Sequence, residues 1–279
     1  MSATSVQDRD YAFLGAGIIA GVFVERMVRC GVPPARICVS DAVQEKAGSL
    51  AVKFGVRAAD SNREAAAAGD VVFLAVPSAA VCAVVEEVRD ALRPDAMLVS
   101  LAAAVRTEWI EESAGGGRKV LRLIPNTASL AGEGMNPHCL GRRIEPQDLP
   151  FVDALLALFG ATARIDEELM ETVTALTAVG PTFVFPVMQA MRDAAVAAGL
   201  APELAARAAA QTVLGAARLV LETGRPPEEL RQMIGAHALD EDAARALIRG
   251  AYESALAKLC QARERLAAAR GSAPAKRQP

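Results

Sequence analysis

The feature that most constrains the fold of this chain is a glycine-rich turn close to its N-terminus, Gly15-Ala-Gly-Ile-Ile-Ala20. The turn follows the short apolar run Tyr11–Leu14 and precedes a helical pattern that stops at Gly31. Strand, turn and helix in this order form the G-x-G-x-x-G/A fingerprint of dinucleotide binding. The first glycine allows the tight turn, the second lets the backbone approach a pyrophosphate, and the final alanine permits close packing of helix on strand.

Short apolar runs alternate with helical patterns throughout the first half of the chain. After the first run, the predicted strands are Arg36–Val39, Asp70–Val76, Ala96–Leu101, Lys119–Leu123 and Thr162–Ile165. The run Asp70–Val76 is apolar almost throughout, which is typical of a parallel strand covered on both faces. The repeated strand–helix order predicts an α/β Rossmann-like fold with a doubly wound parallel sheet.

After residue 166 the strand pattern ends, and the predicted helices are Glu167–Ala198, Pro202–Thr223, Pro227–Ile234 and Glu241–Arg270. The first contains Gly180-Pro181, where we expect a break because proline interrupts a helix. We predict a dinucleotide-binding domain over residues 1–166, an all-helical dimerisation domain over 167–270 and a disordered tail over 271–279. Because these helices are too apolar to stand alone, we expect a homodimer or a larger homo-oligomer.

Composition excludes several classes of partner. The formal net charge is −3 and no basic block is present, so no nucleic acid is expected as a partner. The five cysteines are scattered without a CxxC pair, which predicts neither a disulfide framework nor a metal site. No apolar run approaches the ~18 residues of a membrane span, and the polar N-terminus lacks a secretion signal. We expect a cytoplasmic protein without a membrane partner.

Residues at the ends of the predicted strands complete the expected cofactor site, because ligands of doubly wound sheets bind at the carboxyl ends of strands. The full set of expected cofactor residues is Gly15, Gly17, Ile18, Ile19, Ala20, Ser40, Asp41, Val76, Pro77, Ala103 and Asn126. An acidic side chain at position 41 accepts hydrogen bonds from the adenosine ribose and repels a 2′-phosphate. No arginine follows it, so we expect NAD(P)H with a preference for NADH. A helix N-cap is the alternative role for Asp41.

Two polar segments farther along the chain are candidates for the substrate side of the site. A strand ends in Pro125-Asn126-Thr127, which places two hydrogen-bonding side chains at the same sheet edge; a simple turn is the alternative. The polar, glycine-containing segment Glu171–Phe183 interrupts an apolar helix near the domain junction. Free N–H groups at a restarted helix suit a substrate carboxylate, whereas a proline kink satisfied by packing is the alternative.

Taken together, these motifs resemble those of the pyrroline-5-carboxylate reductase family, from the fingerprint to about Lys258. Besides the fingerprint, the matching segments are Ser100–Ala103, Arg122–Thr127 with Gly132 and Gly134, Thr174–Thr177, Gly180-Pro181, Ala198–Leu200, Gln211-Thr212, Gly215-Ala216 and Pro227–Leu230. The resemblance implies a Rossmann-like domain, a helical dimerisation domain and hydride transfer from a reduced nicotinamide to a cyclic imine carboxylate. It also implies that Asn126, Thr174 and Thr177 face the nicotinamide, the imine or its carboxylate.

The chain departs from this family in two segments. Family members carry Ser-Gly-Ser/Cys-Gly-Pro-Ala at the junction, where this chain has Thr177-Ala-Val-Gly-Pro-Thr182. The family loop Ser-Pro-Gly-Gly-Thr-Thr is replaced by Met233–Asp240, in which His237 is a candidate carboxylate donor or general acid and a solvent-exposed histidine is the alternative. Glu171 stands where the family commonly has aspartate, either as a support of the pocket or as a surface charge.

The resemblance leads us to predict NAD(P)H-dependent reduction of a cyclic imine, of the type that converts pyrroline-5-carboxylate to proline. Two alternatives stay open because function lives in the site and not in the fold. One is an NAD(P)-dependent reductase of a different imine or carbonyl substrate. The other is a catalytically silent dinucleotide-binding dimer.

Overall fold

The computed structural model of the chain describes residues 5–235 and 238–271. It divides into two compact units, one running up to Ala178 and resuming at Leu256, the other spanning Val179–Ala255. We call them the sheet unit and the helical unit. The division differs from the predicted boundary at residue 166, because helix α7 (Met170–Thr177) and the last part of α11 (Glu241–Gly271) belong to the sheet unit.

The sheet unit is built on eight strands in the part of the chain that the structure describes. They are β1 (Tyr11–Leu14), β2 (Ile37–Ser40), β3 (Arg57–Ala58), β4 (Val71–Leu74), β5 (Met97–Ser100), β6 (Lys119–Leu123), β7 (Gly134–Leu140) and β8 (Gly160–Arg164). Their spatial order is β3-β2-β1-β4-β5-β6-β7-β8. The strands from β3 to β6 are parallel, whereas β7 runs antiparallel to β6 and carries β8 parallel to itself.

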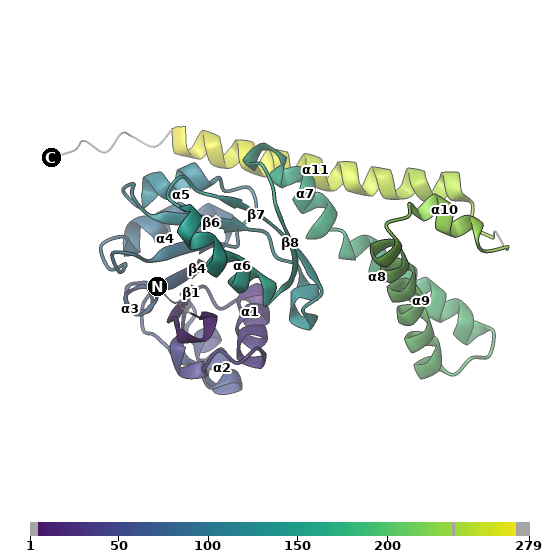
Figure 1. Cartoon of the computed structure of the whole chain (residues 1–279), viewed down its shortest axis with the longest axis horizontal. Helices are drawn as coiled ribbons and strands as arrows, with labels where there is room; N and C mark the ends of the chain where they lie inside the picture. Colours follow the sequence, from purple (N-terminus) through teal and green to yellow (C-terminus); the bar gives the residue numbers. More distant parts are fainter. Residues whose placement is uncertain (1–4, 236–237, 272–279) are drawn as a thin grey trace. The chain divides into compact units, whose positions relative to one another are not determined.

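Helices cover both faces of the sheet (Figure 1), because successive strand residues point to opposite sides. Tyr11 and Phe13 of β1 pack with α1 (Ile18–Arg29), α2 (Gln44–Phe54) and α6 (Leu149–Ala157). Ala12 and Leu14 pack on the other side with α3 (Asn62–Ala68), α4 (Val81–Val88) and α5 (Thr107–Ser113). Both faces are thus buried, and the predicted doubly wound α/β fold is confirmed. Short 3₁₀ helices are η1 (Val6–Asp8), η2 (Pro34–Arg36), η3 (Ser78–Ala80), η4 (Thr127–Ala131), η5 (Pro146–Asp148) and η6 (Glu167–Leu169).

Strand β7 was not predicted, because it contains residues that favour turns. Pro137 lies inside it, where its carbonyl accepts the N–H of Ile124 at 3.0 Å. Asn136 is fully buried, yet its amide is satisfied by the Ser129 hydroxyl at 2.8 Å and the Phe159 carbonyl at 3.1 Å. Long-range partners of this kind leave no local pattern. These partners hold a stretch with turn-like composition as a strand between β6 and β8.

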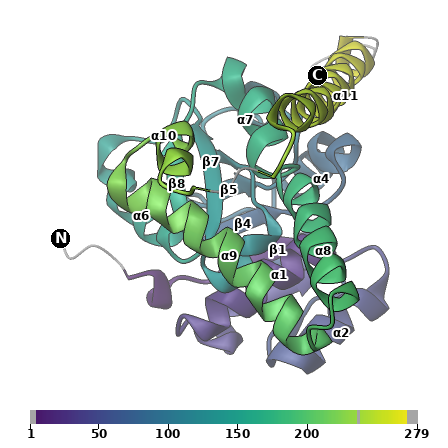
Figure 2. The ribbon, with the colours of Figure 1, turned by 90° about the vertical axis from the view of Figure 1, so that its right-hand side faces the viewer.

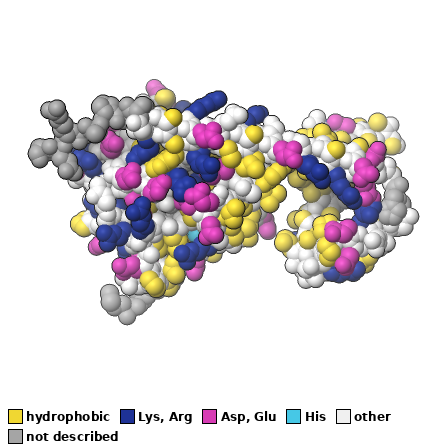
Figure 3. All heavy atoms as spheres, turned by 90° about the horizontal axis from the view of Figure 1, so that it is seen from above, with side chains coloured by type: hydrophobic (Ala, Val, Ile, Leu, Met, Phe, Trp, Pro, Cys, Tyr) yellow, Lys and Arg dark blue, Asp and Glu magenta, His cyan; other side chains and the backbone are white. Residues whose placement is uncertain are grey.

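The helical unit contains α8 (Pro181–Ala197), α9 (Pro202–Thr223), α10 (Pro227–Gln232) and the first part of α11. Helices α8 and α9 pack against each other (Figure 2). The predicted break is present, because α7 ends at Thr177 and α8 begins at Pro181. Hydrophobic side chains lie at the surface of this unit (Figure 3), including Phe185 at 58% and Leu221 at 82% exposure.

Two stretches of the described chain are long and apolar enough to cross a bilayer by length and composition alone. They are Glu167–Ala197 and Pro202–Thr223, each with 11% of its most apolar window buried. The expectation that no apolar segment approaches that length therefore needs correction. That expectation rested on uninterrupted apolar runs. In these alanine-rich segments a few polar residues interrupt the runs, but the mean hydropathy stays high.

Candidate functional site

The glycine-rich turn connects β1 to α1 at the carboxyl edge of the sheet. Gly15 has a backbone φ of 103°, and a Cβ built there would lie 2.6 Å from the carbonyl oxygen of Ala75. Glycine is therefore required at this position. Gly17 is the N-cap of α1 without a side-chain cap bond, and a Cβ built there would meet no atom within 4 Å. The N–H groups of the first turn of α1 are accordingly open to an anion.

A cleft of about 630 Å³ opens beside this turn. It lies where β1 has β2 on one side and β4 on the other, the point at which the strand order reverses and ligands bind in such sheets. The predicted cofactor residues that line it are Gly15, Gly17, Ile19, Asp41, Val76, Pro77 and Ala103. Lys46, Asn62 and Ser78 line it too, although the sequence reasoning did not assign them to the site. Asn62 was missed because α3, which it begins, was not predicted.

Asp41 is fixed at the exit of β2 by two backbone groups. Its carboxylate accepts the N–H of Ala16 in the glycine-rich turn at 2.8 Å and the N–H of Val43 at 2.9 Å. The alternative role of helix N-cap is wrong, because α2 begins at Gln44 and its N-cap is Val43. Asp41 therefore ties the exit of β2 to the fingerprint turn while lining the cleft.

Four other expected cofactor residues do not line the cleft, namely Ile18, Ala20, Ser40 and Asn126, the last of which is described below. Ile18 begins α1 and is 84% exposed. Ala20 is buried in the core between α1 and the sheet, which is the close-packing role of the last fingerprint position. Ser40 is buried and donates its hydroxyl to Asn62 at 2.9 Å, so it supports a lining residue from behind.

Asn126 joins the exit of β6 to the end of α7. Its side-chain oxygen accepts the N–H of Ala128 at 3.0 Å as the N-cap of η4, and its Nδ2 donates to the carbonyl of Thr177 at 3.0 Å. The hydroxyls of Thr174 and Thr177 donate to the carbonyls of Met170 and Val173 in their own helix. The three residues expected to face the substrate are thus brought together in one unit, but Thr174 is only 2% exposed.

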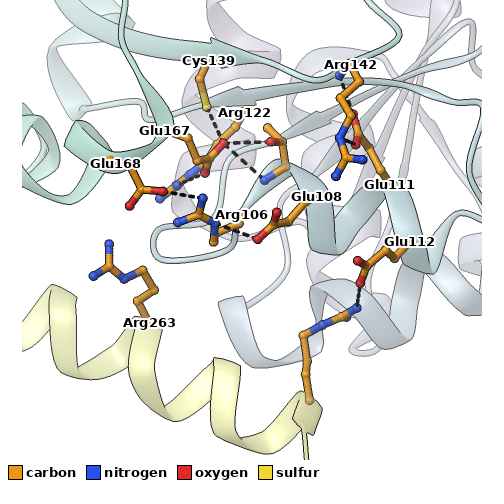
Figure 4. A network of polar contacts seen from close by, with 12 residues as sticks. Arg106, Glu108, Glu111, Glu112, Arg122, Cys139, Arg142, Glu167, Glu168 and Arg263 are labelled. Carbon is orange, nitrogen blue, oxygen red and sulfur yellow. Dashed lines mark hydrogen bonds and ion pairs between the residues drawn. The ribbon is translucent and has the colours of Figure 1, made fainter. Parts of the chain in front are cut away.

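Arg122, four positions before Asn126 in the chain, belongs to a network of charged side chains (Figure 4). Arg122 of β6 is fully buried and forms ion pairs with Glu167 and with Glu171, the latter at 2.9 Å. Glu167 also accepts the Thr107 hydroxyl at 2.8 Å and the Cys139 thiol at 3.0 Å. Glu171 is 2% exposed, so of the two alternatives given for this position the surface charge is wrong.

The network shifts the titration of its members. Burial raises the pKa of Glu167, but the thiol of Cys139, the charge of Arg122 and the Thr107 hydroxyl outweigh burial and leave that pKa below its ordinary value. Burial and the hydrogen bond to Glu167 raise the pKa of Cys139, which keeps this thiol protonated. Glu167 is therefore an ionised acceptor at neutral pH and the thiol is its donor.

The two histidines of the chain contribute no described group to the cleft. His138 lies in β7, and burial lowers its pKa. Its Nδ1 has no hydrogen-bond partner among the residues that the structure describes. His237, the expected carboxylate donor or general acid, lies outside the described residues.

A groove of about 450 Å³ runs between α9 and α10 in the helical unit. Its lining is mostly apolar and gathers several segments on which the family resemblance rests. The lining residues are Gln211, Thr212, Gly215, Ala216, Leu219, Val220, Pro227, Leu230, Arg231 and Ile234. Arg231 at this groove is paired with Glu241 of α11.

Comparisons with known families match both parts of the chain. Residues 167–270 match the family described as pyrroline-5-carboxylate reductase dimerisation. Residues 10–104 match the family described as NADP oxidoreductase coenzyme F420-dependent. The first match begins at the predicted boundary, whereas the compact units divide after Ala178.

Individual relatives of the chain are named pyrroline-5-carboxylate reductases. A pyrroline-5-carboxylate reductase of Methanosarcina acetivorans is 32% identical over 86% of this chain and 93% of its own length. One from Pseudomonas aeruginosa is 35% identical over 80% of this chain and 82% of its own. Among solved structures, a pyrroline-5-carboxylate reductase from Coxiella burnetii is 30% identical, with a TM-score of 0.75 over 95% of this chain and 99% of that one. The NADP-bound Plasmodium falciparum enzyme has a TM-score of 0.81 over 91% of this chain and 97% of its own at 21% identity, which shows the shared fold.

Proposed function

Because the chain belongs to the pyrroline-5-carboxylate reductase family, we propose that it reduces 1-pyrroline-5-carboxylate to proline with NAD(P)H. The observation that carries the proposal is the glycine-rich turn Gly15–Ala20 beside the cleft. Gly15 is required by the fold, whereas Gly17 leaves an open space that the fold itself does not use. Such a space beside the N-terminus of α1 fits a pyrophosphate.

The residues of the cleft fit a nicotinamide dinucleotide along its whole length. The first turn of α1 would hold the pyrophosphate, Asp41 the adenosine ribose, and the strand exits at Val76, Pro77 and Ala103 the nicotinamide half. When bound, the reduced cofactor supplies the hydride that the imine carbon receives.

We propose NADH as the preferred form of the cofactor. The Asp41 carboxylate lies at the exit of β2 and would repel a 2′-phosphate. Lys46 lines the same cleft with the opposite charge, so the preference is a balance of two side chains. Asp41 dominates this balance because two backbone N–H groups hold its carboxylate in place.

The corner formed by Asn126 and the end of α7 is the proposed substrate side. A protonated imine needs little acid catalysis, so the protein mainly has to fix geometry and exclude water. Asn126 holds the last turn of α7 at the strand exit. The Thr177 hydroxyl donates its proton to Val173, which leaves its oxygen lone pairs to accept the N–H of the protonated imine. Thr174, being buried, supports this helix from inside, and His237 stays a prediction for the carboxylate.

We propose that the enzyme works in the cytoplasm as a homodimer. Large apolar side chains of the helical unit are exposed in the single chain, among them Phe185 at 58%, Leu221 at 82% and Leu247 at 72%. Their burial against a second copy would stabilise the assembly by roughly 25 cal/mol per Å² of apolar surface. The match of residues 167–270 to a dimerisation family supports this reading of the apolar helices over a membrane span.

The test is oxidation of NADH and of NADPH, measured separately by absorbance, with 1-pyrroline-5-carboxylate as substrate. Turnover that produces proline, with the higher kcat/KM for NADH, is the expected result. Nucleotide binding without turnover of this imine would overturn the substrate assignment. A panel of other cyclic imines and carbonyl compounds would then separate an altered reductase from a silent dinucleotide-binding dimer.

A further inference from the structure

The carboxylate of Glu171 holds three elements of the sheet unit together. One of its oxygens accepts from Arg122 of β6 at 2.9 Å, and the other accepts from Arg263 of α11 at 3.1 Å. Glu171 itself belongs to α7. A nearly buried carboxylate shared between two guanidinium groups leaves each of its oxygens with a charged donor.

The two helices held in this way are the ones that connect the units. Helix α7 ends at Thr177, just before the chain enters the helical unit at Val179. Helix α11 brings the chain back, because the sheet unit resumes at Leu256. Arg263 lies on the returned part of α11. Glu171 thus fastens the outgoing and the returning helix to the same strand.

Helix α7 has a second attachment at its other end. Asn126, just beyond β6, donates to the carbonyl of Thr177 at 3.0 Å. Arg122 and Asn126 therefore hold α7 near its first turn and at its last residue, both from β6 and its exit. The placement of Thr177 relative to the cleft edge depends on these two attachments.

A role in packing alone does not require this arrangement. A buried ion pair gains little stability over well-packed apolar residues of similar volume, since both charges must be desolvated. In addition, the Arg122 Nε atom is buried without a hydrogen-bond partner in the described part of the chain. What the charges add is direction, because a planar guanidinium donates along fixed N–H directions, so the contacts of Arg122 and Arg263 with Glu171 allow few relative positions of the two helices and the strand.

We propose that Glu171, clamped between Arg122 and Arg263, is a positioning residue of the reductase that holds the end of α7 in register with the strand exit at Asn126. The inference rests on the proposed function, in which Thr177 orients the imine. It assigns to a residue of the returning helix α11 an effect on imine binding, although Arg263 need not touch the substrate. Nucleotide binding depends on the glycine turn and is outside the clamp.

The test compares Arg263→Met, Arg263→Lys and Arg265→Met in the full-length protein. Arg265 is an exposed arginine on the same helix without an ion pair among the described residues, which makes it the matched control. For Arg263→Met we expect the imine KM to rise about tenfold, because even a small misplacement of the group that orients the imine is costly. The Kd for NADH should stay within twofold of wild type. Arg263→Lys should restore most of the loss, and Arg265→Met should change nothing.

An unchanged imine KM in Arg263→Met, with or without a lower Tm, would overturn the proposal. If the wild type itself does not turn over 1-pyrroline-5-carboxylate, the proposed function fails. The clamp of Glu171 between Arg122 and Arg263 is then tested by measuring amide hydrogen exchange over residues 174–182. Faster exchange in Arg263→Met than in Arg265→Met supports the clamp. Equal exchange in the two variants refutes it.

Discussion

Replacing each glycine of the fingerprint turn by alanine separates what the fold needs from what the cofactor needs. At Gly15 a methyl group would lie 2.6 Å from the Ala75 carbonyl oxygen at a φ of 103°. Backbone strain of about 1–3 kcal/mol and overpacking of about 1–3 kcal/mol add to a loss of about 2–6 kcal/mol. For a chain of this size that lowers the Tm by about 4 °C or more.

At Gly17 the same methyl group would meet nothing within 4 Å at a φ of −75°. Glycine is a better N-cap than alanine, but alanine restricts the unfolded chain, a gain of about 0.4–1 kcal/mol. These effects nearly cancel, so Gly17→Ala should unfold within about 1 kcal/mol of wild type. A pyrophosphate approaching the α1 N-terminus would meet the methyl group. Losing one charge-assisted hydrogen bond costs about 1.5–3 kcal/mol, which weakens nucleotide binding about tenfold to a hundredfold.

Thermal unfolding and fluorescence titration with NADH measure the two effects independently. We expect Gly15→Ala to lose stability and Gly17→Ala to lose nucleotide affinity while keeping its Tm. Wild-type affinity in a stable Gly17→Ala protein would remove the pyrophosphate from this turn. A Gly15→Ala protein as stable as wild type would refute the steric argument at Ala75.

Two further predictions concern charge. Asp41→Asn keeps an acceptor for the Val43 N–H and removes the negative charge. The ratio of kcat/KM for NADPH over NADH should therefore rise about tenfold, equivalent to about 1.4 kcal/mol. An unchanged ratio would refute a role of Asp41 in cofactor choice and leave only its structural role of connecting β2 to the glycine-rich turn. The pKa of Glu167 is below its ordinary value of 4.5 in the folded protein, so its contribution to stability is complete above that pH and is lost as the pH falls through the lowered pKa. The difference in unfolding free energy between wild type and Glu167→Gln, measured in urea at neutral pH and at successively lower pH, should therefore shrink on acidification, and a constant difference would contradict the assignment.

Elements with strong local signals were predictable to the residue. Helix α9 spans Pro202–Thr223, as the sequence predicts, and α2 spans Gln44–Phe54. Both end at a glycine in the left-handed region, Gly55 at a φ of 73° and Gly224 at 64°, and α9 begins with a proline in its first turn. Stop and start residues of this kind act within a few positions of the chain, so a single sequence carries them.

The charge network was not predictable in the same way. Arg122 and Glu171 are 49 positions apart, and Glu171 and Arg263 are 92 apart. A glutamate on an amphipathic helix has the same local pattern whether it faces water or a buried arginine. The one available signal was Arg122 itself, a cation within the apolar strand Lys119–Leu123, since a buried charge requires a partner somewhere in the fold.

The difference between local signals and long-range contacts also explains which features of the site were predictable. The positions of its residues were easier to predict than the hydrogen bonds of its side chains. In a doubly wound sheet the topology alone brings the exits of β1, β2, β4 and β5 to one edge, so Gly15, Asp41, Pro77 and Ala103 had to meet at the cleft. What Asn126 bonds to depends on where α7 packs, and that placement rests on contacts with residues far away in the sequence. The Asn126 amide links the strand exit to α7, and we propose that it acts on the imine through the helix that it holds.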